Sequence, residues 1–312
     1  MATACAAFGP DSSFLFNSPS KWSFNGIPDG ITELMTKAPK AKDILDVALG
    51  PDGSYCVVYT NQAGEPMLRR NELPPALEKW FIPVPGNGLS AKRDLASLNV
   101  ALGPNGSFFA FDSNGAFWSN LPAGFNDALS QRLDSKGNFK SGDYPQSVSL
   151  GADGTYVMTT VGGGGMWNLC GTNDILSNFL KESKSLKGIY VILSPSRTGV
   201  HLVVTNTGGC ASTTPTSCHQ QYLDFAEDWK TSCQRVMNQA AVRRRNAQQS
   251  ANIGKAVVKG LGLMNKILNA ANGNASGGGG QVYTSDTYVQ DNSMDMSSFW
   301  APINSAASDP IQ

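Results

Sequence analysis

Three sets of residues in this chain, two of them recurring, have types and spacings that could do chemistry. In the first set, an aromatic residue or Arg is followed within two residues by an Asn just ahead of a predicted helix. An aromatic ring can stack on an apolar ligand face, and an amide can bond ligand hydroxyl or N-acetyl groups. The same residues also have a structural reading, in which the ring packs between sheets and Asn bonds nearby backbone groups. The candidate ligand contacts of this set are Phe24, Asn25, Arg70, Asn71, Trp118, Asn120, Trp167 and Asn168.

The second set is polar and falls at one position of a short strand that recurs along the chain. An unpaired buried Asp or Asn costs roughly 1–3 kcal/mol, so these side chains must line a channel, hold water or touch a ligand. Asp46 and Asn99 are therefore added to the candidate ligand contacts. The members of this set are Cys5, Asp46, Asn99, Ser147 and Tyr190.

The third set comprises the possible acid–base groups, and it is small. The chain has two histidines, His201 and His219. An enzyme built on a single axial pocket would use Asp46, Tyr190 or His201 as its acid or base. His201 falls within the apolar run 200–204, which predicts a strand, so a packed histidine is the simpler reading.

No metal or cofactor is predicted. The spacing C-x7-C-H-x13-C, from Cys210 to Cys233, matches no zinc pattern. The run Gly162–Gly165 is not followed by Lys-Ser/Thr or by a helix signal, so it predicts a wide turn and not a phosphate loop.

The elements that position these residues are clearest in the segment that begins LNVALGPNGSFFAFDSNGAFWSNLP at Leu98. It predicts strands at 99–102, 108–111 and 116–119, with Pro104-Asn105-Gly106 as the first turn. A helix should begin at Pro122, because apolar residues follow at a spacing of four.

This unit recurs, with looser copies at the start of the chain and from Ile189. The turn glycines Gly9, Gly50, Gly103 and Gly151 are 41, 53 and 48 residues apart. Periods of this size are typical of propellers and solenoids, and antiparallel strands favour the propeller. The sequence thus predicts a mainly β, five-bladed propeller-like repeat domain with a C-terminal α-helical extension.

The layout of strand, Pro-Asn-Gly-type turn, second strand and aromatic strand closing on proline resembles the five-bladed tachylectin-type propeller lectins. The resemblance covers about residues 4–230 and rests on repeat layout, because the Trp-rich segment between tachylectin blades is replaced by a helix-like PxxL stretch. It implies binding of N-acetylated sugars, with one site per blade.

Composition sets limits on the class of protein. The net charge is zero, charged residues make up 15%, and the chain contains 33 glycines. No global field favours nucleic acid, and no apolar run of about 18 residues predicts a membrane span. The N-terminus lacks a basic region before apolar residues, so a soluble cytoplasmic protein with reduced thiols is expected.

The sequence predicts three regions: a repeat domain at 1–221, a basic amphipathic helix at 222–271, and a Gly-rich linker with a flexible acidic tail at 272–312. Between Asp228 and Asn272 the local net charge is +7. An apolar stripe of period 3.6 predicts that the helix docks on the repeat domain, on a second subunit or, less simply, on a membrane. The stripe consists of Ile253, Val257, Leu261, Met264 and Leu268.

The leading functional hypothesis is a non-enzymatic binding protein, lectin-like, with repeated sites between blades. An enzyme using the axial pocket and a protein-interaction scaffold remain as alternatives, because fold does not decide function. The expected partners are a carbohydrate or small molecule and a second copy through the C-terminal helix.

Overall fold

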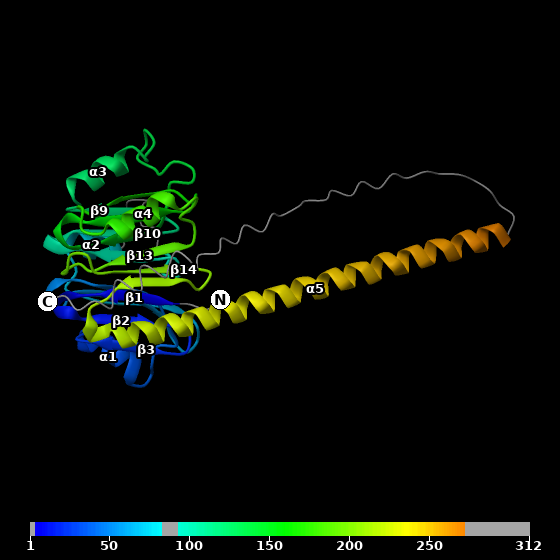
Figure 1. Ribbon diagram of the computed structural model, residues 1–312, viewed down its shortest axis with the longest axis horizontal. Coiled ribbons are helices and arrows are strands. Elements are labelled where there is room, and N and C mark those ends of the chain that lie inside the picture. The colour runs from blue at the N-terminus through cyan, green and yellow to red at the C-terminus, as the bar shows by residue number, and fades with distance from the viewer. Residues whose placement is uncertain (1–3, 83–92, 272–312) are drawn as a thin grey trace. The chain divides into compact units, whose positions relative to one another are not determined.

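The chain is mainly β, and its computed structural model describes residues 4–82 and 93–271. Within those residues, fifteen strands form five three-stranded antiparallel sheets, and a long helix follows them (Figure 1). This confirms the predicted fold class at the level of repeated sheets and a C-terminal helix. Each sheet contains three strands consecutive in sequence, so the sheets are numbered 1 to 5 in chain order.

Each repeat runs strand, tight turn, strand, turn, strand and helix. Sheet 1 contains β1 (Cys5–Phe8), β2 (Phe14–Asn17) and β3 (Trp22–Asn25), and sheet 2 contains β4 (Asp43–Leu49), β5 (Tyr55–Thr60) and β6 (Pro66–Asn71). Sheet 3 contains β7 (Asn99–Leu102), β8 (Phe108–Asp112) and β9 (Gly115–Ser119), and sheet 4 contains β10 (Pro145–Leu150), β11 (Tyr156–Thr160) and β12 (Gly165–Asn168). Sheet 5 contains β13 (Ile189–Leu193), β14 (His201–Thr205) and β15 (Cys210–Thr213). The helices are α1 (Asp29–Thr36), α2 (Pro75–Phe81), α3 (Ala123–Ser130), α4 (Asp174–Glu182) and α5 (His219–Ala271).

The tight turn between the first two strands of a sheet explains the recurring Pro-Asn-Gly and Pro-Asp-Gly motifs. In sheet 3, Asn105 has φ 55° and Gly106 has φ 68°, both in the left-handed region that Asn, Asp and Gly tolerate best. The N–H of Ser107 donates to the carbonyl of Pro104 at 3.0 Å and closes the turn. In sheet 1 the second of these positions is Ser12, which also has a positive φ, 63°.

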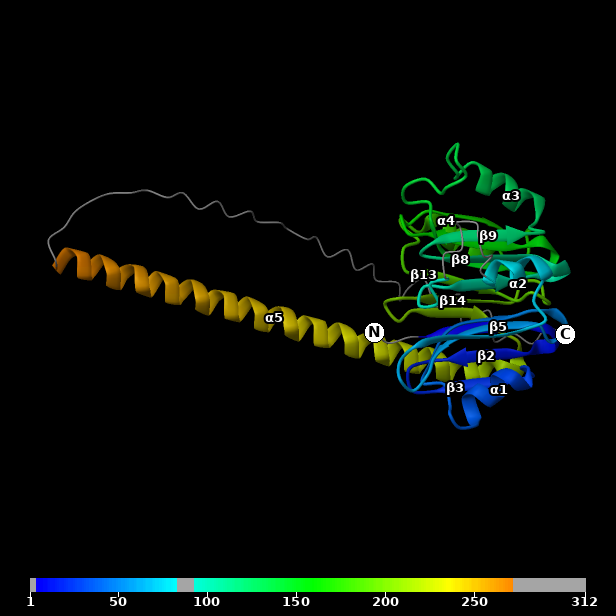
Figure 2. The same ribbon diagram turned by 180° about the vertical axis from the view of Figure 1, so that it is seen from behind.

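Consecutive sheets contact one another through their first strands. β1 contacts β4, and the series continues through β7, β10 and β13, which contacts β1 again. Sheets 1 and 5 are therefore neighbours, and they lie side by side in both views (Figures 1 and 2). The glycine that precedes each turn lies against the leucine that ends the first strand of the next sheet. A Cβ added at Gly103, for example, would lie 2.9 Å from Leu150 Cβ, so a larger residue does not fit.

Five clusters of buried apolar residues occupy the described part of the chain, and each lies between two neighbouring sheets. We call the space between two such sheets a seam. A helix fills each seam: α1 contributes Ile31 and Met35 to the seam of sheets 1 and 2, and α3 contributes Phe125 and Leu129 to that of sheets 3 and 4. α2 and α4 fill the seams of sheets 2 and 3 and of sheets 4 and 5 in the same way.

The first turns of α5 fill the remaining seam, between sheets 5 and 1. Tyr222, Phe225, Trp229 and Cys233 lie in one cluster with residues of both sheets, including Phe16 and Leu202. These helical residues recur every three or four positions and form a single buried face. The sequence placed the end of the repeat domain at residue 221, whereas the described residues divide into compact units at 4–234 and 235–271. The difference arises because the start of the helix is core of the last seam.

No helix in residues 4–82 and 93–271 combines the length and apolarity needed to cross a membrane. The predicted apolar stripe 253–268 lies on helical backbone, as expected, but its side chains lie outside the description. The predicted linker and acidic tail, 272–312, lie outside the described residues altogether.

Candidate functional site

The ring positions of the aromatic–Asn motifs occupy equivalent places on the third strands. Phe24 pairs with Leu15, Arg70 with Cys56, Trp118 with Phe109 and Trp167 with Val157. Residues directly opposite in an antiparallel pair share a sheet face. These partners belong to the clusters between each sheet and the next one along the chain. The rings and Arg70 therefore face the following seam.

The amides that follow these residues face the other way. Asn71 pairs with Tyr55 and Asn168 with Tyr156, and both tyrosines belong to the cluster shared with the preceding sheet. Adjacent strand residues point to opposite faces, so no ring shares a seam with the amide beside it in sequence. Asn120 departs from the pattern, because it lies beyond β9 with φ 54°.

The fold instead brings a ring from one sheet to the same seam as an amide from the next. Phe24 and Asn71 share the seam of sheets 1 and 2, while Trp118 and Asn168 share that of sheets 3 and 4. Both rings are half-buried, and both amides are exposed. Asn25 faces the seam of sheets 5 and 1, because its partner Phe14 belongs to that cluster.

The neighbours of the rings show how firmly each is held. Trp118 stacks on Phe109, with ring centroids 5.2 Å apart and planes at 4°, and its centroid is 6.1 Å from that of Phe139. Arg70 makes a 2.9 Å ion pair with Glu78 and lies 5.3 Å above the Phe81 ring. Arg70 is thus engaged by α2, whereas Trp118 keeps part of its surface open.

Asp46, of the polar set on the first strands, faces the first strand of the following sheet, and one of its Oδ atoms accepts a 2.9 Å hydrogen bond from the N–H of Val100. Ser149, two residues beyond Ser147 and outside that set, accepts a similar bond of 2.8 Å at Oγ from the N–H of Leu193. These bonds satisfy backbone donors at the edge of a first strand. Burial raises the pKa of Asp46 to about 7, although hydrogen bonds from the Val100 and Val47 backbones act in the opposite direction.

The other members of that set have different surroundings. Asn99 donates through its amide to the carbonyl of Ser97 at 3.0 Å, and Tyr190 is 39% exposed. Ser147 shares a 3.0 Å hydrogen bond with Thr159. Burial raises the pKa of the Cys5 thiol, so this cysteine is an inert neutral group at neutral pH.

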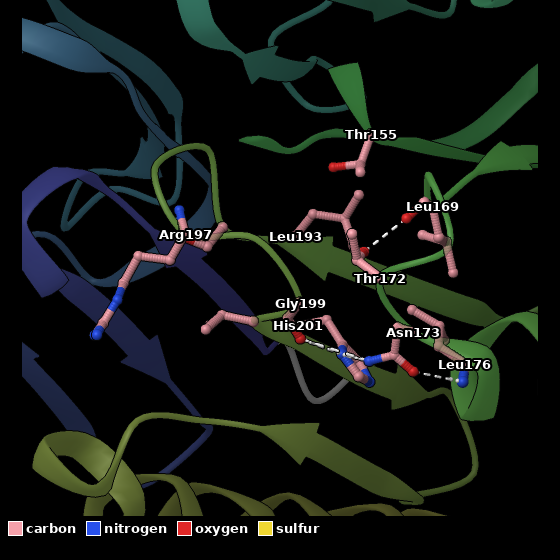
Figure 3. A pocket seen from close by; sticks show the side chains of 11 residues that line it. Thr155, Leu169, Thr172, Asn173, Leu176, Leu193, Arg197, Gly199 and His201 are labelled. Carbon is pink, nitrogen blue, oxygen red and sulfur yellow. Dashed lines mark hydrogen bonds between the residues drawn. The ribbon is translucent and has the colours of Figure 1, made fainter. Parts of the chain in front are cut away.

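His201 lines a small cleft at the start of α4 (Figure 3). Its Nδ1 lies 3.0 Å from the Asn173 amide nitrogen and 2.8 Å from Thr213 Oγ1. Asn173 is the N-cap of α4 and accepts from the N–H of Leu176 at 2.8 Å. The cleft volume is about 10 Å³, room for one water at most. Burial lowers the pKa of His201 to about 4, so the imidazole is neutral near pH 7.

The three acid–base candidates are not brought together. His201 pairs with Leu193 and faces the seam of sheets 4 and 5, whereas Tyr190 pairs with Val204 and faces that of sheets 5 and 1. Asp46 faces sheet 3, where its carboxylate meets Val100. Among the described residues, no group of three or more His, Cys, Asp and Glu is placed to hold a metal ion.

The contacts that join sheet 5 to sheet 1 had no signal in the sequence. Asp228 of α5 accepts hydrogen bonds from the backbone and hydroxyl of Ser20, and Trp229 donates from Nε1 to the Thr205 carbonyl at 2.9 Å. Burial alone would raise the pKa of Asp228, but the hydrogen bonds from Ser18 and Ser20 outweigh it and the pKa is lowered. Arg197 reaches Ser12 at 3.0 Å. The Ser20–Asp228 and Ser12–Arg197 pairs are 208 and 185 residues apart, so local pattern cannot indicate them.

The chain matches no protein-family model, and no curated protein is significantly similar to it in sequence.

Proposed function

We propose that residues 4–234 form a five-bladed β-propeller that acts as a non-enzymatic binding module. The proposal is supported by the circular series of first-strand contacts, in which β13 contacts β1. It is supported also by the five equivalent seams, each filled by one helix. A propeller in which the N- and C-terminal blades meet needs a specific clasp, and the first turns of α5 supply it.

The ligand class that we propose is an N-acetylated sugar, held at a seam. The observation that carries this is the meeting of a half-buried ring and an exposed amide from neighbouring sheets at the same seam: Phe24 with Asn71, and Trp118 with Asn168. A ring stacks on the apolar face of a sugar, and an amide bonds its hydroxyl or acetamido groups. Seams without both a ring and an amide would not bind the sugar, so the proposal implies about two binding sites and not five.

Calorimetry of the full chain with N-acetylglucosamine tests this function. Asn168→Ala and Asn71→Ala should each weaken one class of site. Asn25→Ala is the matched control, because Asn25 faces a seam whose ring position is held by Ser212. Absence of heat for the unaltered protein, or equal losses for all three variants, would overturn the sugar proposal. The propeller would then need a different ligand.

A further inference from the structure

The second compact unit, the part of α5 from Arg235 to Ala271, has an unusual charge content. Residues 235–285 contain seven Lys and Arg and no Asp or Glu. The residues of this stretch whose side chains are described are exposed: they include Arg235 and the run Arg243–Arg245, and Val242 is 54% exposed. Most of the stability of a helix in a protein comes from packing of an amphipathic face, so a partner surface is expected.

The distal part of the helix has a distinct division of residue types. Along an α-helix successive residues turn by about 100°, which places Lys255, Lys259 and Lys266 within a single arc of roughly 40°. The apolar residues at positions 253, 257, 261, 264 and 268 fall on the opposite arc. The helical backbone from 251 to 271 therefore carries a lysine face and an apolar face with no acidic residue in either.

This pattern discriminates between a second copy of the helix and an anionic lipid surface as the partner of the apolar face. A second copy of the helix would offer an apolar face, but it would also bring seven more positive charges alongside the first seven, with no carboxylate in this stretch to pair with them. An anionic lipid surface offers both an apolar layer and compensating charge. Interfacial helices commonly combine an apolar face with a Lys- or Arg-rich polar face.

We propose that residues 235–271 of α5 bind an anionic lipid membrane surface, with the apolar face at the acyl boundary and Lys and Arg near the headgroups. Each Lys or Arg near such a surface contributes about 1 kcal/mol, which corresponds to about fivefold in affinity. The Arg243–Arg245 run adds charge on several sides of the helix and strengthens the attraction without defining a face. The inference concerns a surface separate from the seams and does not depend on the sugar proposal.

The test is co-sedimentation of the full chain with vesicles of phosphatidylcholine containing about one-third phosphatidylserine, and with phosphatidylcholine alone. Binding should require the anionic lipid and should weaken as salt is raised. The triple variant Lys255→Gln, Lys259→Gln, Lys266→Gln should bind about 100-fold more weakly. Glutamine has nearly the helix propensity of lysine, so the helix itself should be retained.

A matched control removes three exposed lysines from the repeated sheets instead: Lys40→Gln, Lys136→Gln and Lys184→Gln. This variant should bind like the unaltered protein. A second variant, Leu261→Ser with Leu268→Ser, should also lose binding if the apolar face enters the membrane. Equal binding to the two kinds of vesicle, equal weakening by the control, or no binding at all would overturn the proposal. So would a dimer by light scattering that the Leu261→Ser, Leu268→Ser variant abolishes while vesicle binding persists unchanged, since the apolar face would then meet a second copy.

Discussion

The carboxylate of Asp46, on the first strand of sheet 2, accepts a hydrogen bond from the backbone N–H of Val100, on the first strand of sheet 3. The bond joins the first strands of two neighbouring sheets and satisfies a backbone donor that no strand pairs. Its acceptor is nevertheless a carboxylate whose charge is disfavoured by burial. An amide oxygen would accept the same bond without that cost.

Asp46→Asn should therefore raise stability at neutral and alkaline pH. The folded pKa, about 7, lies above the unfolded value of 3.8, so the contribution of Asp46 is most favourable below pH 3.8 and is lost as pH rises through 7. At pH 8 the variant should be more stable by up to about 4 kcal/mol, and by much less near pH 4. Urea unfolding at both pH values measures the difference. Asp43→Asn, at an exposed position of the same strand, is the control, and a gain independent of pH would contradict the argument.

His201 should have the opposite pH signature. Its folded pKa, about 4, lies below the unfolded value of 6.5, so its stabilising contribution is complete above 6.5 and is lost as pH falls towards 4. Between pH 7 and 4.5 the protein should lose about 2–3 kcal/mol from this group. His201→Phe should remove that loss. The position is suited to phenylalanine, because its equivalents in the other sheets are Phe14, Tyr55, Phe108 and Tyr156.

Unfolding of the unaltered protein and of His201→Phe across this pH range checks the assignment. The matched control is His219→Phe, at a partly exposed histidine. If His201→Phe and the unaltered protein lose stability in parallel on acidification, another group is responsible.

The short-range features of this fold could be read from the sequence. Pro104, Asn105 and Gly106 predict a hairpin because their backbone preferences are local, and strand β7 begins and ends where expected.

The candidate site could be predicted only in part. The ring and amide positions were visible, but which of them meet depends on sheet faces and on the order of sheets. Trp118 lies in the seam that Asn168 faces, 50 residues further along the chain, whereas the nearby Asn120 lies beyond the end of β9.

The surface that covers the start of the C-terminal helix could not be predicted, for a related reason. Tyr222, Phe225 and Trp229 have the spacing of one helix face, so the helix itself was predictable. The surface that covers this face includes Phe8 and Phe16, which lie more than 200 residues earlier in the chain. Nothing local distinguishes a helix that docks there from one that binds elsewhere.

Ser12 is strained relative to its equivalents, and Ser12→Gly should stabilise the protein. Ser12 has φ 63°, and the equivalent turn positions of sheets 2, 3 and 4, which also have positive φ, are occupied by Gly53, Gly106 and Gly154. The expected gain is about 0.5–1 kcal/mol, reduced by the loss of the exposed contact with Arg197. The reverse change, Gly53→Ser, should cost a similar amount, because a Cβ at Gly53 meets no atom within 4 Å and only the backbone conformation opposes it. Thermal melting of both variants measures the pair, and shifts of the same sign would refute the explanation.

The closure of sheet 5 on sheet 1 should depend on the first turns of α5 and not on the rest of the helix. Trp229 is 7% exposed, lies in the cluster that contains Phe16 and Leu202, and donates from its indole to the Thr205 carbonyl. Trp229→Ala would open a cavity and remove the indole donor, although the Thr205 carbonyl would keep the Gly208 N–H at 3.1 Å, so the change should cost about 3–5 kcal/mol. Deleting residues 241–312 removes none of these contacts and should leave the unfolding midpoint of the sheets within about 0.5 kcal/mol. Urea unfolding followed by near-ultraviolet circular dichroism compares the two proteins with the unaltered chain.

Leu223→Ala serves as a matched control on the same helical turns, since Leu223 is 43% exposed and its replacement should cost little stability. A truncated chain as unstable as Trp229→Ala would show that the distal part of α5, and not its first turns between sheets 5 and 1, holds the repeated sheets together.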